Sequence, residues 1–255
     1  GLLPLIDQGW LWGRTGYGTW RRIGPMMPGA TPVGTLAGAL AITFGWEKAN
    51  VRRYIEADDD RALADWLCSR RPRDNPDDTA FLLAIDQFEE LFTFADSNER
   101  RHFDRLLATA LQDADCPLFV ISTVRSDFLD RFAKDLPRLV AVRNRQGRPW
   151  TLAPIGDEGL REVIEGPARL AGLDVGEVRE AMVTEARDEP GALPLVENAL
   201  HFLWEQRQGN RLSGRLFNEQ GGLAGILSRS ADNLLSDLGA KQSAQALELL
   251  FHLVR

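Results

Sequence analysis

The chain has 255 residues, which is enough to bury a sizeable core in one large or two modest domains. Its hydrophobic content of 44% is ordinary for a globular protein, and its net charge of −7 argues against a broad nucleic-acid surface, which needs clustered cations. Cys68 and Cys116 lie far apart without metal-ligand spacing, so we expect a reducing, cytoplasmic setting. No signal peptide is visible, and no run approaches the ~18 apolar residues that a membrane span needs.

A strand and a helix are expected in the first fifth of the chain. The strand is predicted within residues 18–27. Residues 28–32 (PGATP) then supply a turn, with Thr31 as a helix N-cap and a proline at the first helical position. The following stretch, residues 33–44, is rich in alanine and leucine and predicts a helix.

No G-x-x-x-x-G-K-[ST] phosphate-binding loop occurs in the 255 residues. The nearest glycine-rich segment, residues 13–18, has no Lys-Ser/Thr after it and no strand before it, so we interpret it as a loop. Either the protein lacks a phosphate-binding loop, or this sequence starts just past one. The order of the elements along the rest of the chain favours the second interpretation.

The most informative segment is residues 81–92 (FLLAIDQFEELF), in which five apolar residues run directly into Asp86. A continuous apolar run of this length is typical of a strand buried on both faces, as in a parallel sheet. A carboxylate at the carboxyl end of such a strand lies where open α/β sheets bind their ligands, and in a Walker B segment it holds Mg²⁺ against nucleotide phosphates. The structural alternative for Asp86 is a helix N-cap at a strand–helix junction.

A second strand is predicted within residues 117–125, and the residues between the two strands have the apolar spacing of a helix. That gap is long enough for a right-handed crossover between parallel strands. Asp86 and Arg125 would then emerge at the same edge of the sheet, one positioned for a metal ion and the other for a phosphate. The alternative for Arg125 is a surface salt bridge with a nearby acid, Asp127 or Asp130.

After a last predicted strand within residues 150–154, the pattern favours helices only. Apolar residues recur at helical spacing in five stretches beyond residue 157. These stretches are residues 160–171, 178–186, 191–208, 226–238 and 244–254. A parallel α/β domain to about residue 153, followed by an all-helical module, is the architecture of P-loop switch ATPases with a helical lid.

Segments along nearly the whole chain resemble, in order, the novel STAND NTPase type 1 family, which is found beside WD40 or other repeat arrays in large bacterial signalling proteins. The matching segments are 1–4 (GLLP), 85–92 (IDQFEELF), 123–131 (TVRSDFLDR), 152–155 (LAPI), 164–168 (IEGPA), 171–173 (AGL), 192–197 (ALPLVE), 203–205 (LWE) and 221–225 (GGLAG). The first of these resembles the residues just after that family's Walker A helix.

The resemblance implies an α/β fold with three parts. Residues 1–153 would be a parallel-sheet P-loop NTPase core lacking its Walker A motif. Residues 154–222 would form an all-helical lid domain. Residues 223–255 would begin a winged-helix-like or helical module.

The resemblance also implies a role for each matching position. Asp86 would help to hold Mg²⁺, and Glu89 or Glu90 would orient or activate the attacking water, a choice that the sequence leaves open. Arg125 occupies the place of the arginine that reports the γ-phosphate in STAND proteins, and Thr123 would contact the nucleotide from the same segment.

In the helical part, Pro194 occupies the place of the lid-domain proline that packs against adenine in the family. Residues 191–194 are also a plain helix start that uses proline in its first turn. One departure concerns Met27, which stands where the family often has an arginine before Pro-Gly.

The resemblance therefore implies an ATP- or ADP-binding module that works with Mg²⁺ as a nucleotide-gated switch or assembly scaffold with slow hydrolysis. Effector and repeat sensor domains of the full-length protein would be its partners, and it would form a homo-oligomer on activation. Nucleic-acid and membrane partners are not expected. This stretch on its own is expected to be inactive as an ATPase.

Two other functions are compatible with these residues. One is a protein-interaction scaffold that keeps the fold without nucleotide turnover. The other is a metal nuclease built on Asp86, Glu89 and Glu90. The nuclease is disfavoured because no lysine lies near those acids and the chain is net acidic.

Overall fold

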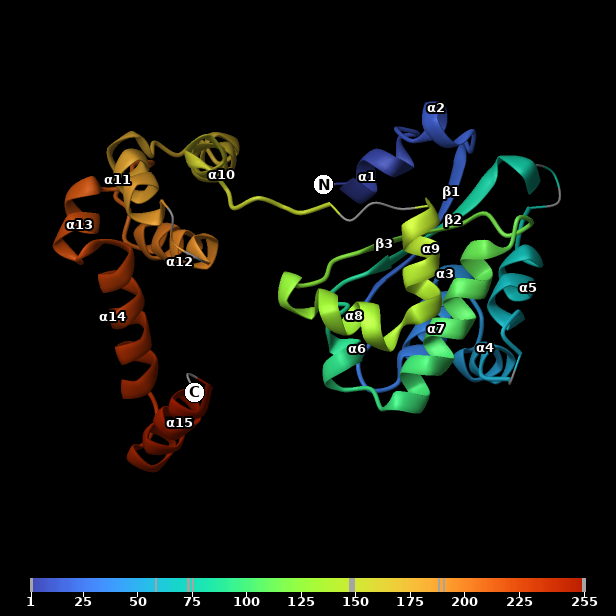
Figure 1. Cartoon of the computed structure of the whole chain (residues 1–255). Coiled ribbons are helices and arrows are strands. Elements are labelled where there is room, and N and C mark those ends of the chain that lie inside the picture. Colours follow the sequence, from blue (N-terminus) through green and yellow to red (C-terminus); the bar gives the residue numbers. More distant parts are fainter. Residues whose placement is uncertain are drawn as a thin grey trace. The chain divides into compact units, whose positions relative to one another are not determined.

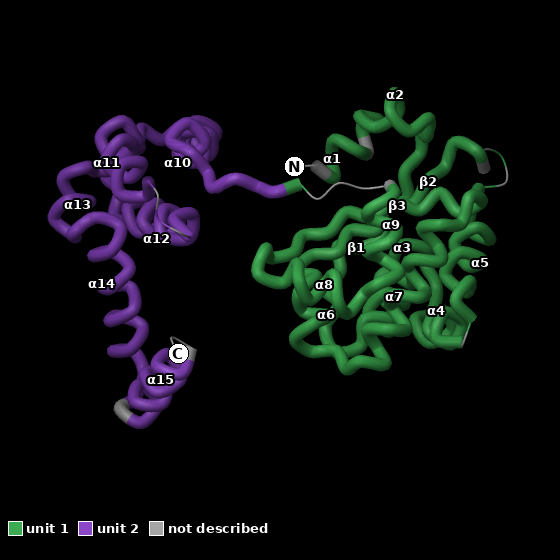
Figure 2. Tube along the Cα trace, in the orientation of Figure 1, with its two compact units in different colours: residues 1–150 green, residues 151–255 purple. Residues whose placement is uncertain are grey.

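The computed structural model describes residues 2–57, 59–72, 74, 76–146, 150–187, 189 and 191–253. The chain divides into unit 1, residues 1–150, and unit 2, residues 151–255 (Figure 2). The strands belong to unit 1, and unit 2 is built from helices (Figure 1). None of the described helices is long and apolar enough to cross a lipid bilayer.

In unit 1, groups of helices precede, separate and follow the parallel strands along the chain. Its regular elements are α1 (Leu2–Asp7), α2 (Trp12–Thr15), β1 (Thr19–Met26), α3 (Pro32–Phe44), α4 (Lys48–Ile55), α5 (Ala62–Cys68), η1 (Pro76–Asp78), β2 (Thr79–Ile85), α6 (Glu90–Thr93), α7 (Ser97–Gln112), β3 (Leu118–Ser122), η2 (Ser126–Phe128), α8 (Leu129–Asp135) and α9 (Pro137–Gln146).

The described strands form one parallel sheet in the order β1-β2-β3. In the register of the central pair, Phe81 lies opposite Leu118 and Ile85 lies opposite Ser122. All seven residues of β2 are buried, as the continuous apolar run predicted. The α/β fold with a parallel sheet is therefore confirmed. β1 and β3 lie within their predicted segments, and β2 starts at Thr79, two residues before the predicted run.

One face of the sheet carries the core of unit 1. Phe81, Leu83 and Ile85 point from β2 into a cluster that also includes buried residues of α3 and α7. These two helices lie against the sheet and α9 packs on α7 (Figure 1). The edge strand β1 reaches this core with an irregular register at Gly24, whose φ of 87° suits glycine and where an added Cβ would lie 2.7 Å from the carbonyl oxygen of Ala84.

On the opposite face of the sheet, side chains of β1, β3 and the segment before β1 are partly exposed to solvent. The rings of Tyr17, Trp20 and Phe119 pack edge to face across it, with the Trp20 and Phe119 centroids 5.2 Å apart. Phe119 and Ile121 of β3 remain 36% and 38% exposed. Within the described residues β3 pairs only with β2, so its outer edge is open as well.

The prediction of a strand within residues 150–154 is wrong, since residues 150–156 form no regular structure. Trp150 and Leu152 are 87% and 81% exposed, and no described strand pairs with this segment. An apolar segment becomes a strand only when another strand satisfies its backbone groups. At α3, Pro32 begins the helix as predicted, whereas Thr31 at the N-cap makes no side-chain capping bond.

Unit 2 is a helical array with its own core. Its helices are α10 (Asp157–Leu170), α11 (Gly176–Ala186), α12 (Ala192–Glu205), α13 (Gly214–Glu219), α14 (Gly222–Ser236) and α15 (Ala240–Leu253). The five predicted helical stretches correspond to α10, α11, α12, α14 and α15, although residue 254 lies outside the described part. The short helix α13 was not predicted.

Helices α11, α12 and α14 share the core of unit 2. Met182, Val196 and Ile226 are among its buried members. Glu185 of α11 accepts a hydrogen bond from the backbone amide of Leu223, 2.7 Å away, and so holds the first turn of α14. A separate module beginning at residue 223 stays a prediction.

Candidate nucleotide site

The site residues of unit 1 gather at the carboxyl edge of the sheet because the backbone pairing continues past the strands. The amide of Asp86 donates to the carbonyl of Met26 at 2.8 Å, and the amide of Thr123 donates to the carbonyl of Ile85 at 3.0 Å. The amide of Phe88 then donates to the carbonyl of Thr123 at 2.9 Å. These bonds fix the chain segments after β2 and β3 side by side.

The carboxylate of Asp86 is held from the β3 side. Its Oδ1 accepts a hydrogen bond from the hydroxyl of Thr123 at 2.6 Å and another from the amide of Gln87 at 3.0 Å. Its Oδ2 has no hydrogen-bond partner among the described residues, and the side chain is exposed. The N-cap alternative for Asp86 does not hold, because the N-cap of α6 is Glu89.

The turn after Asp86 is strained at Gln87, which has a φ of 49°. A residue with a side chain in this left-handed region costs about 1–2 kcal/mol. The amide of Gln87 is satisfied there by two acceptors, Oδ1 of Asp86 and Oγ1 of Thr123, each 3.0 Å away. The same two side chains thus hold both the turn and the orientation of the carboxylate.

The two glutamates after the turn take different directions. Oε2 of Glu89 accepts a hydrogen bond from the amide of Arg125 at 3.4 Å, on the β3 side. Oε2 of Glu90 accepts one from the amide of Gly29 at 3.2 Å, in the connection that follows β1. Both side chains are half-buried.

The guanidinium of Arg125 forms a bidentate pair with Asp127. Nε lies 3.0 Å from Oδ1 and Nη2 lies 3.0 Å from Oδ2. The pair is open to solvent, with the Arg125 side chain 67% exposed, and the hydrogen bond from Arg125 lowers the pKa of the Asp127 carboxyl. In this structure Arg125 therefore makes the surface ion pair that was the alternative to a phosphate contact, while its backbone lies at the site.

An aromatic contact that the sequence analysis missed joins the two site segments. Phe92 of α6 and Phe128 of η2 stack with centroids 6.1 Å apart and planes 19° apart. The guanidinium of Arg131 lies over both rings, and its Nη2 donates to the carbonyl of Phe92 at 2.7 Å. The signal in the sequence was the phenylalanines that follow two predicted strands, Phe88 and Phe92 after one, and Phe128 with Arg131 after the other.

Pro194 lies in unit 2, in the first turn of α12, and is exposed. The helix starts after Gly191, which has a φ of 78° and no side chain to cap the helix. Proline is well tolerated in a first turn because that position has no intrahelical N–H partner. This agrees with a plain helix start, and it leaves the ring free to contact a ligand.

No group of three or more metal-ligating side chains occurs among the described residues. Mg²⁺ does not need one, because it keeps several waters and is held by one or two carboxylates together with substrate phosphates. The free Oδ2 of Asp86, with Thr123 fixing the other oxygen, suits such a partly hydrated ion.

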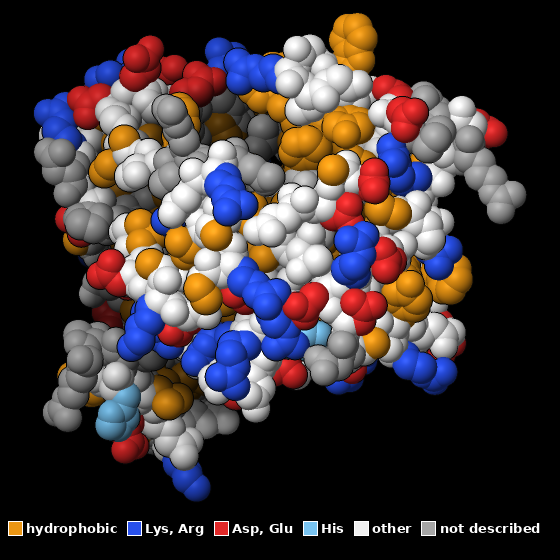
Figure 3. Space-filling view, turned by 45° about the vertical axis from the view of Figure 1, so that its right-hand side comes forward, with side chains coloured by type: hydrophobic (Ala, Val, Ile, Leu, Met, Phe, Trp, Pro, Cys, Tyr) orange, Lys and Arg blue, Asp and Glu red, His pale blue; other side chains and the backbone are white. Residues whose placement is uncertain are grey.

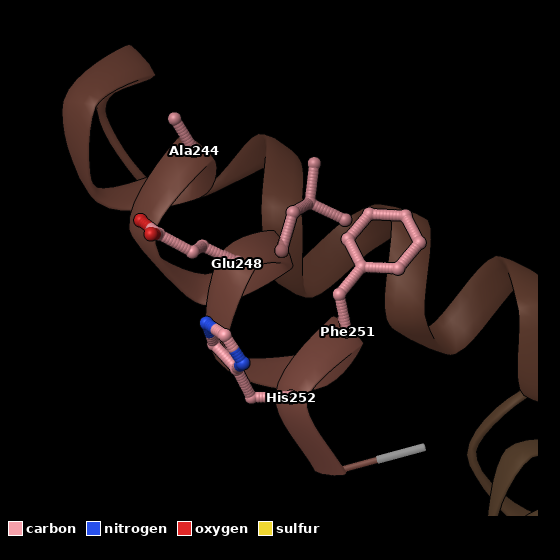
Figure 4. A pocket seen from close by; sticks show the side chains of 5 residues that line it. Ala244, Glu248, Phe251 and His252 are labelled. Atoms are coloured by element: carbon pink, nitrogen blue, oxygen red, sulfur yellow. The ribbon is translucent and has the colours of Figure 1, made fainter. Parts of the chain in front are cut away.

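The charged side chains elsewhere form no single-sign surface in the view of Figure 3, where acidic and basic groups are interspersed. A hollow of about 520 Å³ lies along α15 and is lined by Ala244, Leu247, Glu248, Phe251 and His252 (Figure 4). It contains none of the candidate site residues.

The comparisons with known proteins identify the family and the fold. The whole chain, residues 1–255, matches the model of the family described as Novel STAND NTPase 1. Among curated proteins none matches the chain. Among solved structures, the chain is similar to the Aeropyrum pernix ORC2 protein, whose structure was determined as ADPNP–ADP complexes.

The likeness to the ORC2 protein has a TM-score of 0.56 at 13% sequence identity, over 85% of this chain and 55% of the other. At this identity it shows the fold alone, and this chain spans about half the length of that protein. The fold likeness supports the α/β class, and the family match covers both units. The chain therefore belongs to the Novel STAND NTPase 1 family.

Proposed function

We propose that this chain is the greater part of an ATP-binding switch module that works with Mg²⁺ and hydrolyses ATP slowly in the full-length protein. The observation that carries the proposal is the hydrogen bond from Thr123 to Asp86 at the carboxyl edge of the sheet, 2.6 Å long. Ligands of open α/β sheets bind at this edge. The family match over the whole chain and the ADPNP–ADP complexes of the ORC2 protein support a nucleotide as the ligand.

The phosphate-binding part of the site is proposed to come from a strand, loop and helix outside these 255 residues. The open outer edge of β3 and the exposed Phe119 and Ile121 beside it are features that such an element would cover. A parallel strand on this edge would place its loop next to Thr123 and Asp86. A phosphate loop at that position presents backbone amides and a lysine to the phosphates.

Each site residue then has a proposed task. Asp86, oriented by the hydroxyl of Thr123, would hold Mg²⁺, which would supply positive charge to neutralise the phosphates. One of the acids after the strained turn, Glu89 or Glu90, orients the attacking water. Arg125 leaves its exposed pair with Asp127 to contact the γ-phosphate, an exchange that is inexpensive because a surface salt bridge contributes little.

The switch itself is proposed to be the placement of the helical unit by the nucleotide. Pro194, exposed in the first turn of α12, would pack against adenine. Because ATP and ADP differ by one phosphate, a contact from Arg125 to that phosphate would distinguish the two states. Effector and repeat sensor domains in a cytoplasmic, bacterial signalling protein would read this state, with assembly of a homo-oligomer as one output.

One observation favours a second function, a scaffold that keeps the fold without turnover. Arg125 is already paired with Asp127, and that pair needs no nucleotide. In that case the carboxyl edge would serve only to hold the segments after the strands together.

The test is the binding of nucleotide by the full-length protein. Isothermal titration should show MgATP binding, and Asp86→Ala should weaken it by about tenfold or more because a charged ligand of the metal is lost. The matched control is Asp65→Ala, which removes an exposed carboxylate of α5 in the same unit. A parent protein that does not bind MgATP, or equal binding by parent and Asp86→Ala, would leave the scaffold as the function.

A further inference from the structure

Glu89 and Glu90 are neighbours in the sequence, yet their carboxylates serve opposite sides of the central strand. The sheet order is β1-β2-β3, so whatever contacts the segment after β1 and whatever contacts the segment after β3 lie on different sides of β2. Glu89 contacts the amide of Arg125, after β3, and Glu90 contacts the amide of Gly29, after β1. The two acids therefore do not share one location.

The other polar groups of the site lie on the β3 side. Asp86 directs its bonded oxygen to Thr123, and the amide of Gln87 points at the same hydroxyl. Glu89 acts electrostatically on the Arg125 guanidinium, whose pKa is raised first by its bond to Asp127 and also by the charge of Glu89. The hydrogen bond from the Arg125 amide to Glu89 is long, at 3.4 Å, and therefore weak. The carboxylate loses little interaction energy when it accepts from another donor instead.

Glu90 has a structural partner of its own. Its carboxylate accepts a hydrogen bond from the amide of Gly29, which lies in the connection before α3. Thr31, the N-cap of that helix, makes no side-chain capping bond. A carboxylate near the N-terminal end of a 13-residue helix is stabilised by the helix dipole. The hydroxyl of Thr35, in the first turn, donates to the carbonyl of Pro28 at 3.2 Å and holds the same connection from the other side.

We propose that Glu89 is the acid that positions the attacking water, and that Glu90 is a positioning residue that braces the connection between β1 and α3. The assignment rests on the proposed function for its catalytic half. The structural half, the brace between Glu90 and Gly29, stands without any nucleotide.

The catalytic half is tested by Glu89→Gln and Glu90→Gln in the full-length protein, with Glu158→Gln, an exposed glutamate of α10, as the matched control. Glu89→Gln should lower kcat by about a hundredfold or more while the affinity for MgATP changes little, which leaves ATP bound on the protein. Glu90→Gln should lower kcat far less and leave no trapped ATP. A larger loss of kcat in Glu90→Gln than in Glu89→Gln overturns the assignment.

The structural half is tested by hydrogen exchange at the Gly29 amide, measured by NMR on the full-length protein and its alanine variants without nucleotide. Glu90→Ala should speed this exchange by about tenfold because the amide loses a charged acceptor, whereas Glu89→Ala should leave it at the parent rate. Unchanged exchange in Glu90→Ala overturns the brace. A parent protein that fails to bind MgATP instead overturns the proposed function and the catalytic half, while the result at Gly29 still decides the brace.

Discussion

The hydroxyl of Thr123 donates a hydrogen bond to Oδ1 of Asp86 over 2.6 Å, which joins the residue after β3 to the residue after β2. The same hydroxyl oxygen accepts from the amide of Gln87 at 3.0 Å. One side chain thus fixes the direction of the proposed Mg²⁺ ligand and satisfies the strained turn behind it. The other oxygen of Asp86 is left for a ligand.

This relationship predicts a specific loss in Thr123→Val. Valine has nearly the same shape but neither donates to Asp86 nor accepts from Gln87, so the carboxylate is no longer held. Affinity for MgATP in the full-length protein should fall by about tenfold, as measured by titration calorimetry. Thr123→Ser is the matched control, because it keeps the hydroxyl and should bind within about threefold of the parent. Equal losses in both variants would show that the hydroxyl is not the group that matters.

A second prediction concerns the pair between Arg125 and Asp127. If Arg125 reaches the γ-phosphate, Arg125→Ala should weaken the binding of ATP more than the binding of ADP. The ratio of the two affinities should change by about ten- to a hundredfold. Asp127→Ala frees the guanidinium from its bidentate partner and should increase the affinity for ATP relative to that for ADP. The affinities of both nucleotides for the full-length variants decide the matter.

The contrasting outcome for that pair is equally clear. A plain surface ion pair contributes little, so both substitutions would then have small and equal effects on ATP and ADP. An unchanged ratio in Arg125→Ala would leave Arg125 as surface charge and remove one half of the switch.

The strands of this fold were predictable because their signal is local. The buried strand β2 contains the continuous apolar run of residues 81–85, which no solvent-facing strand would have, and Asp86 marks its end. The same logic failed at residues 150–154 (WTLAP), where a largely apolar segment has no strand to pair with among the described residues. Whether an apolar segment forms a strand depends on its partner, and that is a property of the fold.

The site was predictable only in its outline. The spacing after the strands placed Asp86 and Arg125 at one edge of the sheet, which the hydrogen bonds of these segments confirm, whereas Thr123 was named only through the family resemblance. The different directions of Glu89 and Glu90 were not predictable. Glu89 contacts the segment after β3 and Glu90 the segment after β1, and these contacts depend on the order of the strands in the sheet. The clamp by Arg131 on Phe92 likewise depends on tertiary contacts.

A third prediction concerns the 255 residues alone. Backbone amides and the lysine of a phosphate-binding loop supply most of the phosphate affinity in P-loop enzymes, and the G-x-x-x-x-G-K-[ST] pattern does not occur in this sequence. The isolated chain should therefore bind MgATP with a Kd of about 1 mM or weaker. Calorimetry that gives a micromolar Kd for the isolated chain would contradict the need for an external loop.

The last prediction concerns the pH dependence of unit 2. Hydrogen bonds from Arg161 and then Arg179 lower the pKa of Glu180 from 4.5 to about 2. The Arg161 contact joins α10 to α11, whereas Arg179 lies beside Glu180 on α11. A folded-state pKa below the unfolded value means that the stabilisation is present above pH 4.5 and is lost as the pH falls from 4.5 to about 2. Glu180→Gln removes the titrating group and with it this part of the acid sensitivity.

The measurement is urea unfolding followed by circular dichroism at about pH 7 and about pH 3. The midpoint of Glu180→Gln should be lower than that of the parent at the higher pH and should approach it at the lower pH. Because the group is exposed, about 1 M NaCl should shrink the difference at neutral pH. Glu158→Gln, an exposed change on α10, serves as the control and should keep the acid sensitivity of the parent. A Glu180→Gln variant that loses as much stability on acidification as the parent would show that the arginine contacts do not stabilise the folded unit.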